Sequence, residues 1–352
     1  MNFRLNAIHS KTDELGLDGL LISKEVNVNY LSNFKSDDSY LLFDKKEALF
    51  LTDFRNYQEA KKYVKNLNVV QITDSFFQTV AQLLKKRKIK KLGFEAKGMD
   101  FATYVQLRKR LGKTPKLVAT YDIVEDMRQI KTKEEIALIR KAVNITLEAF
   151  RFAKRILKPN LTENNFISKI ERFVRDKGAE GFSFAPIAAS GKNSSYPHAK
   201  SSNKKIGNNT SVTLDLGVSY RGYKTDLTRV FFLGRIPTEL LNIYNIVCTC
   251  QRQSIAKIKL GICAAQIDKE ARTLIAEKGF GRFFKHSTGH GIGLEVHEKP
   301  FISKRSIQTI AAGMVFTIEP AIYLPNRFGV RIEDMVLVKD NGCEVLSGAL
   351  DK

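Results

Sequence analysis

The chain has 352 residues, 43% of them hydrophobic, which is enough to bury two sizeable cores. Lys and Arg outnumber Asp and Glu by 58 to 37, so the formal net charge is +21, and four cysteines are too few for a disulfide framework in a protein of this length. The start, MNFRLNAIHSKTDELG, has no apolar run typical of a signal peptide, and no stretch approaches the ~18 consecutive apolar residues of a membrane-spanning helix. We therefore expect a cytoplasmic protein without a membrane partner.

The first third of the chain is typical of a mixed α/β unit. The pattern predicts a helix over about 3–16, a strand at 20–22, a strand pair within 39–52 and another strand at 92–94. We expect residues 1–126 to form one domain and residues 127–352 another, with the boundary between Val124 and Lys131.

A helix is predicted to open the second domain. Thr132 and Glu135 have the spacing of a capping box, and apolar residues then recur at helical spacing: Ile136, Ile139, Val143, Leu147 and Phe150. Further along, helices are predicted at 132–157 and 162–177 before one set of strands, and at 238–257 and 265–278 before another. This repeated order, two helices followed by strands, predicts a second domain made of two similarly ordered halves.

Three features are interpreted as structural. The basic run Lys85–Lys91 raises nucleic acid as a partner, but cations are also favourable at a helix C-terminus, so we expect a solvated helix end and no nucleic-acid partner. Cys248 and Cys250 lie in a predicted helix, where positions two apart do not share a face, and we expect buried small side chains and not ligands. His9 is expected to be surface or half-buried, without a catalytic role.

A pair of aspartates flanks a predicted β-hairpin in the C-terminal half. Residues 211–217, SVTLDLG, alternate apolar and polar as a half-buried strand does, and a turn is expected at Tyr220 and Arg221. If the chain folds back there, Asp215 and Asp226 face each other, and cross-strand Cβ atoms lie about 4.5–5.5 Å apart. Two carboxylates this close repel each other unless a cation lies between them. The hairpin therefore indicates a divalent metal site.

A second hairpin and a glycine-flanked histidine complete the predicted site. Glu319 and Glu333 end two strand-like stretches and are symmetric about Asn326. Between the hairpins, residues 286–298 read HSTGHGIGLEVHE, and the glycines let backbone approach a ligand closely. His290 is the imidazole that we expect to bind metal.

One imidazole and four carboxylates form an oxygen-rich ligand set. Such a set favours harder ions such as Mn²⁺ over a thiolate-type zinc site, although ligand type alone does not separate Mn²⁺ from Co²⁺ or Zn²⁺. Five ligands also exceed what one catalytic ion usually takes from protein. We therefore expect two ions about 3.5–4 Å apart with bridging carboxylates, the arrangement of aminopeptidases and phosphatases. Hydrolysis is the predicted chemistry.

The C-terminal half carries five motifs in order: SGKNSSYPHAKSSNKKI (190–206), LDLGVSYRGYKTDLTR (214–229), HSTGHGIGLEVHEKPFI (286–302), GMVFTIEPAIY (313–323) and GVRIED (329–334). Together they resemble the Xaa-Pro peptidases, the aminopeptidase P and prolidase branch of the pita-bread metallopeptidases. Three segments upstream, 27–34, 51–60 and 127–142, are similar to the creatinase-like N-terminal domain and its junction. The resemblance implies an α/β (α+β) protein, with a creatinase-like mixed α/β domain followed by a pita-bread catalytic domain.

The resemblance also implies a ligand set. It places two divalent ions on Asp215, Asp226, His290, Glu319 and Glu333, with Asp226 and Glu333 bridging them. Glu319 is in addition our choice for the proton shuttle.

Other positions resemble residues that contact the substrate. His198 and His297 match histidines that stabilise the tetrahedral oxyanion, a task that suits an imidazole near neutral pH, and His286 matches a histidine of the proline pocket. Tyr323 and Arg331 are similar to groups that orient the ligands, and we place both with His286 among the substrate-binding residues.

The activity implied is release of an N-terminal residue from peptides with proline in the second position, by a protein that is typically a homodimer. The motifs leave open a dipeptidase (prolidase) restricted to Xaa-Pro and, less favoured, a non-catalytic binding protein. Two positions depart from the family pattern: Ala321 and Ser287 stand where glycine is usual or common. Neither is a ligand, so we expect an effect on metal affinity or turnover and not on the type of reaction.

Overall fold

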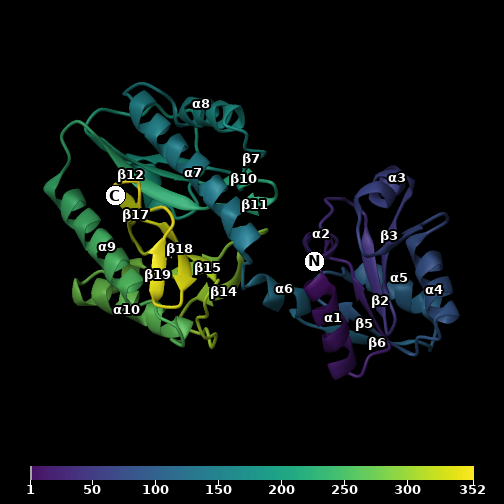
Figure 1. Cartoon of the computed structure of the whole chain (residues 1–352). Coiled ribbons are helices and arrows are strands. Elements are labelled where there is room, and N and C mark those ends of the chain that lie inside the picture. Colours follow the sequence, from purple (N-terminus) through teal and green to yellow (C-terminus); the bar gives the residue numbers. More distant parts are fainter. Residues whose placement is uncertain (1) are drawn as a thin grey trace. The chain divides into compact units, whose positions relative to one another are not determined.

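The computed structural model describes residues 2–352 and divides the chain into two compact units. The first ends at Met127 and the second begins at Arg128. Helix α6 (Ile123–Arg128) carries the chain from one to the other (Figure 1). Among the described residues, each helix is too short or too polar to cross a membrane.

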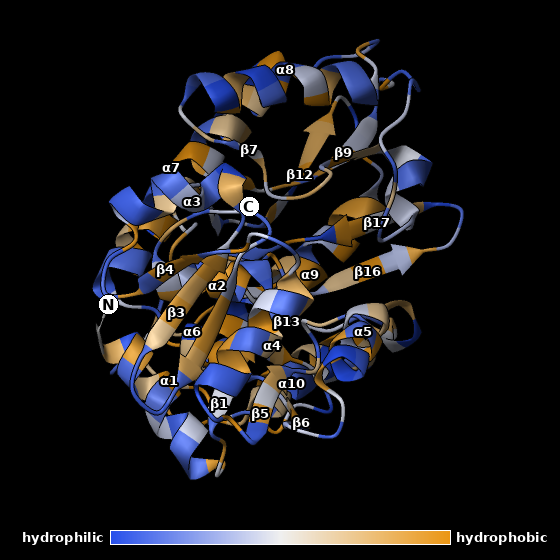
Figure 2. Ribbon diagram, turned by 90° about the vertical axis from the view of Figure 1, so that its right-hand side faces the viewer, coloured by the Kyte–Doolittle hydropathy of each residue, from blue (hydrophilic) through white to orange (hydrophobic). Residues whose placement is uncertain are grey.

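A six-stranded mixed sheet forms the centre of the first unit, in the order β4-β3-β2-β1-β5-β6. Strand β2 pairs antiparallel with β1 and β3, and the remaining pairs are parallel. The strands are β1 (Gly19–Ile22), β2 (Tyr40–Asp44), β3 (Ala48–Thr52), β4 (Asn68–Gln71), β5 (Lys91–Glu95) and β6 (Lys116–Thr120). The helices are α1 (Asn2–Glu14), α2 (Glu25–Ser32), α3 (Phe54–Tyr63), α4 (Phe76–Lys86) and α5 (Phe101–Leu111). Figure 2 shows β3 in the hydrophobic colour, as its burial requires, and the helix and strands predicted here are confirmed.

The second unit repeats an order of two helices followed by strands. Its first half contains α7 (Lys133–Ile156), α8 (Glu163–Asp176), β7 (Gly181–Phe182), β8 (Ile187–Ser190), the short 3₁₀ helix η1 (Gly191–Ser195), β9 (Thr210–Leu216), β10 (Val218–Tyr220), β11 (Tyr223–Lys224) and β12 (Leu227–Leu233). Its second half contains α9 (Thr238–Ala256), α10 (Ala264–Glu277), η2 (Gly281–Phe283), β13 (Gly289–Gly291), β14 (Glu298–Ile302), β15 (Val315–Ile318), β16 (Ala321–Leu324), β17 (Phe328–Arg331), β18 (Asp334–Lys339) and β19 (Gly342–Val345). The four predicted helices are confirmed.

The named strands of this unit pair antiparallel, as predicted. They form the ladders β12-β9-β8, β11-β10-β7, β14-β13-β15-β18-β19 and β16-β17. The pita-bread architecture expected from the sequence is confirmed.

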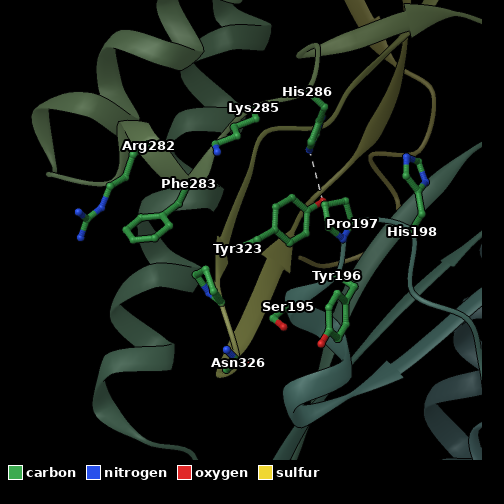
Figure 3. Close-up of a pocket in the computed structure, with 11 residues that line it drawn as sticks. Ser195, Tyr196, Pro197, His198, Arg282, Phe283, Lys285, His286, Tyr323 and Asn326 are labelled. Carbon is green, nitrogen blue, oxygen red and sulfur yellow. Dashed lines mark hydrogen bonds between the residues drawn. The ribbon is translucent and has the colours of Figure 1, made fainter.

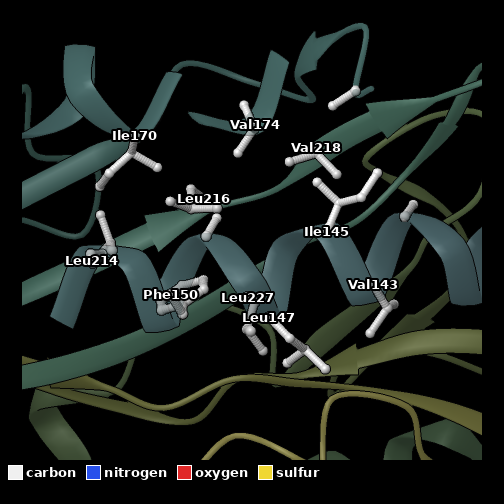
Figure 4. Close-up of a cluster of buried hydrophobic side chains, with 14 of the residues drawn as sticks. Val143, Ile145, Leu147, Phe150, Ile170, Val174, Leu214, Leu216, Val218 and Leu227 are labelled. Carbon is white, nitrogen blue, oxygen red and sulfur yellow. The ribbon is translucent and has the colours of Figure 1, made fainter. Parts of the chain in front are cut away.

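Helix α7 shows how the sequence builds the layer behind the site. Its capping box is present: the Thr132 amide donates to Glu135 Oε2 at 2.8 Å, and the Glu135 amide donates to Thr132 Oγ1 at 3.3 Å. The predicted apolar stripe is buried except for half-buried Ile136, and Phe150 is fully covered. It packs against Leu214 and Leu227 (Figure 4), so the helix supports the strands that hold or adjoin the two aspartates.

The predicted positions of the cysteines, of the basic run and of His9 are confirmed. Cys248 and Cys250 are buried and belong to one apolar cluster with residues of α10 and β17. The lysines of the basic run are exposed or half-exposed around the end of α4, while Arg87 differs, because it pairs with Asp44 and Glu47. His9 is half-buried with its ring edge against another aromatic ring.

Candidate metal centre

The first hairpin has a different register from the predicted one. Strand β12 places Thr228, not Asp226, opposite Asp215, so the prediction that the two aspartates face each other is wrong. The turn is centred one residue later, where Arg221 (φ 50°) and Gly222 (φ 80°) are both left-handed, as a two-residue hairpin turn requires. A shift of two residues along a strand keeps the same face, so Asp226, just before β12, still lies on the side of Asp215.

The second hairpin has the predicted register. Ile318 pairs with Asp334 and Ala321 pairs with Arg331. Glu319 and Glu333 stand between these two pairs at the same register, so the predicted symmetry about Asn326 is confirmed.

Strand β13 holds His290 in a tight backbone setting. A Cβ at Gly289 would lie 1.8 Å from the Thr317 carbonyl oxygen, and one at Gly291 would lie 2.1 Å from that of Lys299. Only glycine fits at these two positions. The His290 amide donates to Thr317 Oγ1 at 3.1 Å, and Nδ1 lies 3.2 Å from the Gly291 carbonyl. An Nδ1–H bonded there leaves Nε2 with a free lone pair.

The structure brings the predicted ligands together. One donor atom each from Asp226, His290 and Glu333 lies within 4.8 Å of the others. His290 Nε2 is 3.6 Å from Asp226 Oδ2 and 3.4 Å from Glu319 Oε1. Asp215 joins the group through Arg331, whose Nη2 donates to its Oδ2 at 2.5 Å.

Two observations fit this cluster to a cation. Asp215 Oδ1 and Glu333 Oε1 are buried and have no hydrogen-bond partner among the described residues, although an unpartnered carboxylate oxygen is costly away from water. Burial and the charge of Glu333 raise the pKa of Asp226 well above its ordinary value, and burial and the charge of Glu319 do the same to Glu333. A divalent ion among these oxygens would relieve both costs.

The pKa values of two further ligand candidates, Glu319 and His290, shift in opposite directions. Burial raises the pKa of Glu319 to about 7, with Arg331 opposing the shift and Asp215 adding to it. Burial lowers the pKa of His290 to about 4, with His297 adding to the shift. The imidazole is therefore neutral near pH 7, which is the form that binds a metal.

Ionisation of the Glu319 carboxyl is expected to cost the metal-free protein stability as the pH rises. A carboxyl with a folded pKa of about 7 and an ordinary value of 4.5 stabilises the fold fully below about pH 4.5, and this contribution is lost as the pH rises through about 7. Mn²⁺ should then raise the Tm of chelator-treated protein more at about pH 8 than at about pH 5. Differential scanning calorimetry at both pH values tests this, and an Mn²⁺ effect independent of pH would contradict it.

Arg331 connects the candidate ligands to residues of the neighbouring cavity. Its Nε donates to Thr228 Oγ1 at 3.1 Å, and its Nη1 donates to Tyr323 Oη at 2.5 Å and to the Pro197 carbonyl at 3.2 Å. Thr228 in turn donates to Glu333 Oε2 at 2.8 Å. The contacts of Thr228 with Arg331 and Glu333 were not predicted from the sequence. The correct hairpin register, which places Thr228 opposite Asp215, would have indicated them.

The three candidate substrate histidines lie around this group. His286 Nε2 is 3.3 Å from Tyr323 Oη, and its Nδ1 is 4.0 Å from Glu319 Oε2. The His297 ring centroid is 4.2 Å from that of His290. Burial lowers the pKa of His286 to about 4, and burial with the charge of His198 lowers the pKa of His297.

A cavity of about 940 Å³ opens beside these residues (Figure 3). Two of the histidines, two tyrosines and several apolar and basic groups line it: Ser195, Tyr196, Pro197, His198, Arg282, Phe283, Lys285, His286, Tyr323, Pro325 and Asn326. Figure 3 shows the Tyr323 hydroxyl directed to the His286 ring, with His198 on the far side of Pro197. A ligand in this cavity would lie against Tyr323 and His286, which contact Arg331 and Glu319.

This fold and ligand set define a metal-dependent hydrolase. Residues 137–340 match the model of metallopeptidase family M24, and residues 4–130 match that of the creatinase/prolidase N-terminal domain. The chain belongs to metallopeptidase family M24.

Relatives of known name agree with this assignment. The Xaa-Pro dipeptidase of Pyrococcus furiosus is 36% identical over 348 residues, which cover 99% of this chain and 98% of the relative. The solved structure of an Xaa-Pro dipeptidase from Bacillus anthracis matches with a TM-score of 0.96 at 37% identity, over 99% of this chain and 98% of that one. An X-Pro aminopeptidase structure from Thermotoga maritima matches with a TM-score of 0.87 at 34% identity, over 96% and 97% of the two chains.

Proposed function

We propose that the protein hydrolyses the peptide bond between an N-terminal residue and proline. The observation that carries the proposal is the cluster of Asp226, His290 and Glu333 with buried, unpartnered carboxylate oxygens beside it. Divalent ions bound there would polarise the scissile carbonyl and activate a water molecule. Asp215 and Glu319 would complete the ligand set for two ions, and Asp226 and Glu333 would contribute to both. Mn²⁺ is our choice of native ion because the ligands are mostly oxygen, with Co²⁺ and Zn²⁺ as alternatives.

The chain's own side chains supply the remaining chemistry. We assign proton transfer to Glu319, which lies near both His290 and His286. His198 and His297 would donate hydrogen bonds to the oxygen that becomes negative in the transition state. Arg331 holds Asp215 and the Tyr323 hydroxyl in place, and His286 with Tyr323 forms the wall for the proline side. A tertiary prolyl amide has no N–H and restricts the residue before it, so a shaped pocket is needed.

The size of the cavity is compatible with an aminopeptidase as well as with a strict dipeptidase. Pockets for small ligands run to about 300–1,000 Å³, and this one, at about 940 Å³, continues from His286 to Arg282 and Asn326. A prolidase restricted to dipeptides stays the alternative.

Homodimer formation and cytoplasmic location are two further proposals. The first rests on family resemblance and is tested by light scattering, and the second rests on the sequence and is tested by cell fractionation.

The test is hydrolysis of an Xaa-Pro dipeptide and an Xaa-Pro-Yaa tripeptide by chelator-stripped protein resupplied with Mn²⁺. We expect metal to restore cleavage of both. Cleavage of the dipeptide alone would replace the aminopeptidase assignment with the dipeptidase one. Inactivity with Mn²⁺, Co²⁺ and Zn²⁺ on both substrates would refute the proposal.

Replacing His198 with alanine is expected to slow turnover while metal stays bound. His198 is exposed on the cavity wall and is not part of the ligand cluster. Removing one oxyanion donor typically lowers kcat by about 10²–10³-fold. Lys200→Ala, an exposed change in the same segment, is the control and should leave kcat unchanged. Full activity in His198→Ala, or loss of metal, would contradict the assigned role.

A further inference from the structure

Glu163 is a fully buried carboxylate in the first turn of α8. Its Oε1 accepts from the amide and hydroxyl of Ser190, both at 2.8 Å. Its Oε2 accepts from the amide of Ser202 at 3.1 Å and from its hydroxyl at 2.9 Å. Asn193 Nδ2 lies 3.2 Å from both oxygens. One carboxylate therefore binds both ends of the segment 190–202.

The segment between these two ends carries one wall of the cavity. Tyr196, Pro197 and His198 belong to it, and all three are exposed. An exposed ring is not held by its own packing, so the backbone of the segment must fix its position. Besides the two anchored ends, Ser194 Oγ accepts from the Gly329 amide at 2.9 Å, and Ala199 is buried. The Pro197 carbonyl, which accepts from Arg331 at 3.2 Å, ties the middle of the segment to the residue that orients Asp215.

The second half of the unit contains a similar arrangement. Asp268, in α10, is also fully buried, and it accepts from the Thr288 hydroxyl at 2.7 Å and from its amide at 3.2 Å. Arg272, bound to Asp268, donates to the His286 carbonyl at 2.6 Å. In each half, a buried acid on the second helix thus anchors the segment that carries a cavity histidine.

We propose that Glu163 is a positioning residue that fixes His198 against the substrate by binding both ends of the segment 190–202. The proposal rests on the hydrolytic function proposed above. Both oxygens must accept backbone N–H groups, so a neutral amide cannot replace the carboxylate. In Glu163→Gln, the amide nitrogen would face the amide of Ser190 or Ser202, and one end of the segment would be released.

The experiment compares Glu163→Gln with Glu171→Gln, a partly exposed glutamate on the same helix that pairs with Arg175. Misplacing a reacting group by about 1 Å can cost about 10²-fold in rate, so we expect kcat to fall by roughly 10- to 100-fold in Glu163→Gln, with metal content retained. Tryptic cleavage after exposed Lys200 should become faster. Ser202→Ala, which removes one hydroxyl donor, should lower kcat and speed cleavage after Lys200, each by less than Glu163→Gln does. It replaces Glu163→Gln in the experiment if that variant does not fold.

A double variant shows whether Glu163 acts through His198. Adding Glu163→Gln to His198→Ala should slow the reaction little further, because the group being positioned is already gone. Additive losses of kcat in the double variant would overturn the proposal. It would also be overturned if Glu163→Gln had the same kcat and the same rate of cleavage after Lys200 as Glu171→Gln. If the native protein cleaves no Xaa-Pro bond, the proposed function fails separately. Unchanged proteolysis in Glu163→Gln would then still overturn the anchoring of the segment, and faster proteolysis would support it.

Discussion

Replacing Asp226 with asparagine is expected to abolish both metal binding and hydrolysis. Asp226 contributes one of three donor atoms that lie within 4.8 Å of one another, and asparagine offers only one neutral oxygen in its place. Loss of a group that merely orients a ligand costs about 10–100-fold in metal affinity, so loss of a ligand should exceed 10²-fold. Metal content after dialysis, measured by mass spectrometry, and hydrolysis of an Xaa-Pro substrate test this.

The same variant should be more stable than the native protein when metal is absent. Burial and neighbouring carboxylates raise the pKa of Asp226. The metal-free protein therefore loses stability as the pH rises through that pKa and the buried carboxyl ionises. Asparagine removes this cost. Asp176→Asn, an exposed change at the end of α8, is the control and should change neither metal content nor Tm. Native metal content in Asp226→Asn would exclude Asp226 as a ligand.

The two hairpins show where sequence reasoning succeeds. Around Asn326, a left-handed asparagine (φ 62°) marks the turn, and the register of Glu319 and Glu333 follows. In the first hairpin the turn includes left-handed Arg221, a residue type that does not mark such positions, and the register was misjudged by two residues. The period of two kept Asp226 on the correct face, so the predicted ligand group survived a wrong pairing.

Helices were predictable because their signals are local. The capping box at Thr132 and the apolar period of α7 lie within one segment. The groups that sequence reasoning missed have partners far along the chain: Thr228 contacts Glu333, and Glu163 binds both Ser190 and Ser202. One sequence does not show which distant donors will meet a buried carboxylate, because those contacts depend on the packed fold.

A further buried group of this kind is centred on Glu298, the residue after His297. Its Oε1 accepts from Lys131 Nζ at 2.8 Å, and its Oε2 accepts from Arg128 Nη2 at 2.5 Å, over a separation of 170 residues. Glu295 also pairs with Arg128, at 3.0 Å. The side chains of Arg128 and Lys131 are only 2% and 1% exposed. Burial alone would raise the pKa of Glu298, but the two cations outweigh it and lower the pKa.

Replacing Glu298 with glutamine is therefore expected to lower the free energy of unfolding by about 3–5 kcal/mol, because it leaves two buried cations without their shared carboxylate. Glu344→Gln is the matched control: it removes the pairs of Glu344, 28% exposed, with Arg140, 43% exposed, and Lys339, 53% exposed, and such exposed pairs contribute only about 0–1 kcal/mol each. Urea denaturation of both metal-free variants, followed by circular dichroism, measures the difference. Equal losses would mean that the cluster around Glu298 stabilises the fold no more than a surface pair does. A large loss confined to Glu298→Gln would instead mean that the segment carrying His297 is anchored, through Arg128 and Lys131, to the start of the second unit.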